Sequence, residues 1–152
     1  MRALNKIGVA AALAACVSVV SASDATKNIV TSYLQIQTAL AADKMDGVKP
    51  AAEAIAKQAQ SMGAPGEPVV KAAKAMSTAK NLEAARTALG PLSDAVIAAA
   101  KADGWKDVSG VALGYCPMVN KSWLQKQGTQ VSNPYYGSQM LTCGDLKDPK
   151  KK

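Results

Sequence analysis

Residues 81–100, NLEAARTALGPLSDAVIAAA, carry the pattern of a long helix. Asn81 is a favourable N-cap, because its side chain can accept a hydrogen bond from the free backbone N–H groups of the first turn. The apolar side chains that follow recur at helical spacing and are Leu82, Ala85, Leu89, Leu92, Val96 and Ala99. Pro91 lacks a backbone donor and clashes with the preceding turn. We therefore expect the helix to kink or split near Gly90-Pro91.

Three similar stretches precede this one and predict three further helices. Their apolar positions are Val30, Tyr33, Ile36 with Gln37, and Leu40; Val48, Ala52, Ile55, Ala59 and Met62; and Val69, Ala72, Met76 and Ala79. Asp24 or Thr26 is the expected N-cap of the first helix, and Asp46 that of the second. Short loops between four such helices favour an up-down bundle. We therefore expect a mainly α fold with a bundle of about four helices over residues 26–102.

Residues 103–144 differ in composition and predict a small cap, irregular or β-containing, beside the bundle. They hold both Trp residues and three of the four Tyr residues. We expect short strands at residues 111–116 and 122–124. Bundle and cap together make one domain over residues 23–144. Residues 145–152, DLKDPKKK, are typical of a disordered basic tail.

The composition excludes several classes of function. The 152-residue chain has no His, so Ser-His-Asp and Cys-His catalysis and imidazole metal sites are excluded. A two-cysteine redox enzyme needs a reactive pair of the CxxC kind, which Cys116 and Cys143 are too far apart to form, so we expect no enzyme. The net charge is +7, but the basic residues are spread out rather than clustered among aromatics. We therefore expect no nucleic-acid partner.

The N-terminus is typical of an export signal. Arg2 and Lys6 precede an uncharged apolar run over residues 7–20, and VSA at residues 20–22 is a small-residue cleavage site. The run is too short to cross a bilayer, so we expect no transmembrane span. An alternative is a lipobox, LAAC, in which Cys16 would become a lipid anchor. Both routes predict an exported protein, periplasmic in a Gram-negative bacterium, and both remove Cys16 from the free thiols.

Four sulfur atoms stand in two short segments of the predicted cap. Cys116-Pro117-Met118 offers one thiol and one thioether, and Met140 with Cys143 offers the same after a loop. Thiolate and thioether are soft ligands that suit Cu(I) or Ag(I). Two cysteines in an exported domain are, however, more often a disulfide, and a Cys116–Cys143 bridge leaves the methionines as packing residues. The pattern leaves both interpretations open.

The motifs YCPM (115–118), KSWL (121–124), NPYYG (133–137) and MLTCG (140–144), with LGPLSDA (89–95) in the bundle, carry a resemblance. The chain resembles a family of exported bacterial domains of unknown function. Its members are found alone or attached to periplasmic adaptor subunits of RND-type copper/silver efflux systems. The resemblance implies a helical bundle, a cysteine-containing cap and a link to heavy-metal handling. Many members carry a longer insert between the Met and the Trp, where this chain has only residues 119–122.

Together these patterns predict an exported protein that binds Cu(I) or Ag(I), for sequestration or hand-off in heavy-metal tolerance. The expected ligands and pocket residues are Cys116, Met118, Met140 and Cys143, with Trp123 and Tyr115 shielding the ion. The expected partners are heavy-metal efflux components or another envelope protein. The alternative is a structural or interaction module with a Cys116–Cys143 disulfide and no metal.

Overall fold

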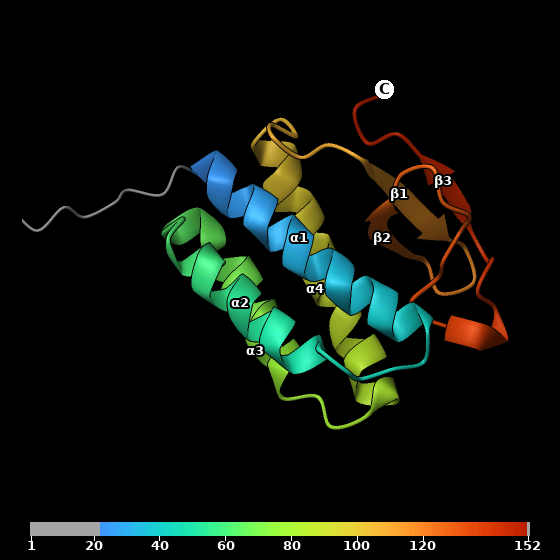
Figure 1. Ribbon diagram of the computed structural model, residues 1–152. Helices are drawn as coiled ribbons and strands as arrows, with labels where there is room; N and C mark the ends of the chain where they lie inside the picture. The colour runs from blue at the N-terminus through green and yellow to red at the C-terminus, as the bar shows by residue number, and fades with distance from the viewer. Residues whose placement is uncertain (1–21, 152) are drawn as a thin grey trace, which may run out of the picture.

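The computed structural model describes residues 22–151, and it places four helices before a small sheet (Figure 1). The predicted signal peptide (residues 1–22), except for Ala22, and the predicted lipidation at Cys16 lie outside these residues. The helices are α1 (Ala22–Ala41), α2 (Val48–Gln60), α3 (Glu67–Ser77) and α4 (Leu82–Ala102). The strands are β1 (Val111–Cys116), β2 (Lys121–Lys126) and β3 (Asp145–Lys147), and the short 3₁₀ turns are η1 (Ala64–Gly66) and η2 (Gly137–Gln139).

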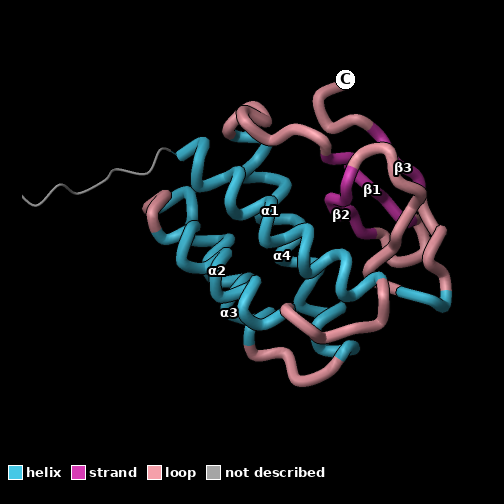
Figure 2. The backbone as a smooth tube through the Cα atoms, viewed as in Figure 1, coloured by secondary structure: helices cyan, strands magenta, loops and turns pink. Residues whose placement is uncertain are grey.

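The helices form a closed bundle. Each helix packs against the next, and α1 packs back against α4 (Figures 1 and 2). The sheet lies at one side of the bundle, where β2 contacts both α1 and α4. This confirms the prediction of a mainly helical fold with a small β-containing cap. Within residues 22–151, no helix combines the length and the apolar character that a membrane span requires.

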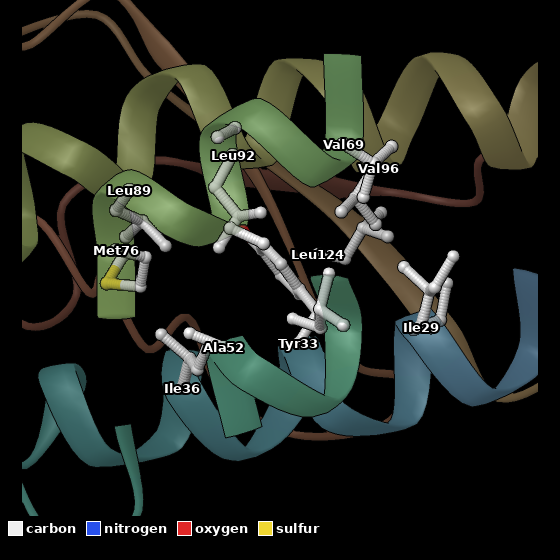
Figure 3. Close-up of a cluster of buried hydrophobic side chains, with 14 of the residues drawn as sticks. Ile29, Tyr33, Ile36, Ala52, Val69, Met76, Leu89, Leu92, Val96 and Leu124 are labelled. Carbon is white, nitrogen blue, oxygen red and sulfur yellow. The ribbon is translucent and has the colours of Figure 1, made fainter. Parts of the chain in front are cut away.

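The core of the bundle is built mainly from small and branched apolar side chains, with the ring of Tyr33 among them. Its buried members drawn in Figure 3 include Ile29, Tyr33, Ile36, Ala52, Val69, Met76, Leu89, Leu92, Val96 and Leu124. The Tyr33 hydroxyl lies 2.6 Å from Ser93 Oγ, so the ring is buried without leaving its polar atom unpaired. Leu124 of β2 belongs to this core, so it joins the sheet to the bundle.

Two predicted helix caps were wrong. Helix α1 already includes Ala22, the first described residue, which places Asp24 and Thr26 inside the helix rather than at its cap. The N-cap of α2 is Gly47, with φ +77° and no side-chain cap, in place of the predicted Asp46. Glycine takes this left-handed conformation at little steric cost, which the connecting turn requires.

Helix α4 confirms its predicted start and corrects its predicted interruption. Asn81 Oδ1 accepts a hydrogen bond from the Ala84 backbone N–H at 2.8 Å, as an N-cap should. Pro91 does not split the helix, which runs unbroken from Leu82 to Ala102. Pro91 itself is exposed, whereas Gly90 and the residues on the inner face are buried, so packing keeps the chain helical on both sides of Pro91. Glycine before proline also avoids the Cβ clash that normally disfavours helix there.

The sheet has the order β2-β1-β3, and both of its pairings are antiparallel. The strand predicted at residues 111–116 is confirmed, and the one predicted at 122–124 extends over Lys121–Lys126. The tail predicted as disordered from residue 145 was wrong over Asp145–Lys147, which form β3. This short, charged strand has no apolar alternation of its own, and it forms because β1 offers a free edge, with Gly114 opposite Leu146.

Candidate functional site: the cysteine pair

The two cysteines of residues 22–151 meet at one end of the sheet. Cys116 is the last residue of β1 and is buried, whereas Cys143 lies in the loop before β3 and is half-buried. Both are free thiols, and the Cys143 thiol is hydrogen-bonded to that of Cys116. The structure therefore brings together two sulfurs that are 27 positions apart in the sequence.

Cys116 sits in a cluster of hydrogen-bond donors. Burial opposes ionisation of its thiol, but hydrogen bonds from Cys143, from the backbone N–H groups of Val119 and Met118, and from the Asn133 side chain outweigh it. The pKa of Cys116 is lowered as a result. The pKa of Cys143 is raised, chiefly because its thiol donates to Cys116. The pair thus has a preferred anionic sulfur and a preferred donor.

Asn133 holds the segment of Cys143 in place. It is fully buried, its Nδ2 donates to the Cys143 carbonyl at 2.9 Å, and its backbone N–H donates to the Leu141 carbonyl at 2.8 Å. Its Oδ1 accepts from the Tyr135 backbone N–H at 2.9 Å. From the sequence, Asn133 was singled out only as part of the NPYYG motif. The Asn-Pro-Tyr order does signal an Asx-turn of this kind, but not its link to the thiols.

Trp123 forms the interior of the cap beside this pair. Its ring is fully buried, its Nε1 donates to Gln125 Oε1 at 3.0 Å, and it packs edge-on against Tyr135 with ring centroids 6.3 Å apart. The indole also lies directly against Gly114 and Gly144, where an added Cβ would come within 2.3 Å and 2.9 Å of ring atoms. The ring therefore borders the cysteine segment from inside, in a packing position.

The predicted thioether ligands lie on the surface next to the thiols. Met118 is 65% exposed and Met140 38%, and their neighbours Tyr115 and Leu141 are exposed as well. These four are the large apolar side chains exposed in the part of the chain that the structure describes. The Tyr115 hydroxyl donates to Asn120 Oδ1 at 2.9 Å. The structure thus brings the two thiols together and leaves the two thioethers outside, at the rim of the pair.

Carboxylates do not extend this site. Among residues 22–151, no three His, Cys, Asp or Glu side chains gather closely enough to hold a metal ion. A divalent ion such as Zn²⁺, which takes four ligands in structural sites, therefore finds no ligand set of these types within that range. What the pair offers is two sulfurs, hydrogen-bond donors around one of them, and thioethers at the rim.

The family model described as "Protein of unknown function (DUF3347)" matches residues 29–107, just over half of the chain. The match spans the helical bundle and ends before β1, so it does not include either cysteine. Comparison with curated proteins finds no match, and comparison with solved structures finds none either.

Proposed function

Because the chain belongs to the DUF3347 family, whose function is unknown, we propose a function from the chemistry of its cysteine pair. Cys116 and Cys143 bind one soft monovalent cation, Cu(I) or Ag(I), between their sulfurs. The observation that carries this proposal is the thiol–thiol contact itself. On binding, the ion takes the place of the two thiol protons, which are released to solvent, and both sulfurs ligate as thiolates.

The surroundings of the pair support binding of a soft ion by anionic sulfur. Thiolates select Cu(I) over Mg²⁺ or Ca²⁺, which prefer oxygen ligands. The N–H groups that point at Cys116 stabilise its thiolate, which is the form that ligates. Binding releases the thiol protons, so affinity falls as the pH is lowered.

The exposed thioethers of Met118 and Met140 provide soft ligands on the surface beside the proposed site. Met118 and Met140 lie at the rim, where each offers a neutral sulfur that can hold an arriving ion before the buried pair takes it. This arrangement suits sequestration or hand-off rather than catalysis, and we propose no enzymatic step. An exported location, and partners among heavy-metal efflux components or other envelope proteins, complete the proposal.

The test is anaerobic titration of the reduced protein with Cu(I) against a chromophoric chelator. We expect one ion per chain, and a loss of affinity of about 100-fold or more in Cys116→Ser and in Cys143→Ser, because each removes one of two thiolate ligands. Met118→Leu and Met140→Leu should slow uptake with little effect on affinity. Met45→Leu, far along the sequence from both cysteine segments, is the matched control. Unchanged binding by the double Cys→Ser variant would overturn the proposal.

The same contact favours a second candidate, a structural disulfide. Bridging Cys116 to Cys143 closes a loop of about 28 residues. The bridge lowers the conformational entropy of the unfolded chain, which stabilises the folded state by roughly 3.6 kcal/mol. Oxidation would remove both thiol hydrogens and pass two electrons to a thiol oxidant of the exported compartment. Intact mass with and without alkylation separates the two candidates. A complete disulfide that resists mild reductant, in protein isolated from copper-fed cells, favours the structural disulfide.

A further inference from the structure

The loop that leads to Cys143 is fastened to the helical bundle at one ion pair. Arg86 of α4 donates through Nη2 to the Asp43 carboxylate and to the Leu40 carbonyl, the latter at 2.9 Å. Its Nε donates to the Pro134 carbonyl at 3.1 Å. The other oxygen of Asp43 accepts from the Ser138 backbone N–H at 3.0 Å. Arg86 and Asp43 thus hold the loop at both ends of residues 134–138.

The loop backbone lies directly on this ion pair. Gly137 has φ +56°, and a Cβ added there would lie 2.0 Å from Asp43 Oδ1 and 2.2 Å from Arg86 Nη2. No side chain fits at this position, so only glycine allows both the turn and the close approach. The ion pair is also partly withdrawn from water, with side chains 19% exposed for Arg86 and 32% for Asp43.

The loop is held by Arg86 and Asp43, which form a clamp on residues 134–138. Short hydrogen-bonded steps connect this loop to the two cysteines. The Gly137 backbone N–H donates to the Asn133 carbonyl at 3.0 Å, so the loop folds back on Asn133. Asn133 in turn donates to the Cys143 carbonyl, and its side chain is one of the groups that lower the pKa of the Cys116 thiol. Cys116 is carried by β1, whereas Cys143 is carried by this loop, and the contact between them depends on where the loop is held.

We infer that Arg86 and Asp43 are positioning residues through which the helical bundle sets the contact between the two thiols. The inference concerns the geometry of the pair and holds whether the pair takes a metal ion or a disulfide. The inference distinguishes this ion pair from the other two within residues 22–151, Lys49–Glu53 and Lys121–Asp94. Those are 4.0 Å and 3.8 Å long, exposed, and of the kind that contributes little.

The experiment measures alkylation of Cys116 and Cys143 by iodoacetamide in the reduced, metal-free protein, residue by residue, by mass spectrometry. Gly137→Ala breaks the clamp from the loop side. Gly128→Ala is the matched control, because Gly128 has φ +78° and open space around its Cβ position. We expect alkylation of Cys116 to rise about tenfold or more in Gly137→Ala and to stay within about twofold in Gly128→Ala, since protection follows local opening.

Arg86→Lys provides a second test that does not rely on glycine. Lysine keeps the charge but lacks the planar fork that serves Asp43, Leu40 and Pro134 at once, so protection of Cys116 should fall here as well. Lys121→Gln, which breaks an exposed ion pair, should leave protection unchanged. If Gly137→Ala does not fold, Arg86→Lys decides the matter.

Equal Cys116 protection in the clamp variants and their controls, with helix content retained by circular dichroism, overturns the inference, even if the clamp variants melt earlier. No metal is present in this assay. A failure of Cu(I) binding would therefore refute the proposed function and leave the clamp standing.

Discussion

Substitution of Gly114 by Ala tests whether Trp123 forms the core of the cap. A Cβ added at Gly114 would lie 2.3, 2.5 and 2.7 Å from Cε2, Cζ2 and Cδ2 of the Trp123 indole. The ring cannot retreat easily, because it is fully buried, bonded to Gln125 and packed edge-on against Tyr135. Overpacking typically costs about 1–3 kcal/mol, and we expect about 3 kcal/mol here, because the obstacle is a rigid ring.

Urea unfolding followed by circular dichroism measures this cost, and a double-mutant cycle assigns it. Trp123→Leu removes the obstacle at its own cost of about 3 kcal/mol, comparable to other large-to-small changes of buried aromatics. In that background Gly114→Ala should cost less than about 1 kcal/mol, which gives a coupling of about 2 kcal/mol between the two positions. An equal cost of Gly114→Ala in both backgrounds would mean that the added methyl group does not meet the Trp123 ring, which would rule out this role of Trp123.

Three further substitutions should lower the free energy of unfolding or change its pH dependence. Asn81→Ala removes the N-cap of α4 and should lower the free energy of unfolding by about 1 kcal/mol in urea titrations. Tyr33→Phe removes the buried bond to Ser93 and should cost about 1–2 kcal/mol by the same method. Hydrogen bonds from Ser138 hold the pKa of Asp43 at about 2, below its usual 3.8. Its stabilising effect is therefore present above about pH 4 and lost as the pH falls through about 2, and acid titration of Asp43→Asn should lack this component.

The helices could be predicted because each buries one face, and burial leaves a regular apolar period in the sequence. Their ends were harder, because a cap depends on the path of the neighbouring loop. Asn81 caps α4 as predicted, whereas Gly47 replaces Asp46 at α2, since the turn needs a left-handed residue more than a side-chain acceptor. The rule that proline ends a helix fails at Pro91. Buried residues on both sides of Pro91 keep the chain helical.

The cap was predictable only where one strand carried its own signal. Residues 111–116 did so, whereas β3 takes its structure from β1 and has no pattern of its own. The cysteines were candidates by chemical type alone. The contact between them depends on Asn133 and on the Arg86 clamp, whose partners lie 10 to 95 positions away along the chain. Hydrogen bonds between residues so far apart produce no periodic pattern in the sequence, so they could not be predicted from it.

X-ray absorption at the copper K-edge, on reduced protein loaded anaerobically and desalted, tests the assignment of the cysteine pair most directly. We expect one Cu(I) per chain with a first shell made of sulfur alone, lost when Cys116 and Cys143 are both replaced by Ser. Copper that washes out on desalting, or a first shell of oxygen or nitrogen, would contradict it.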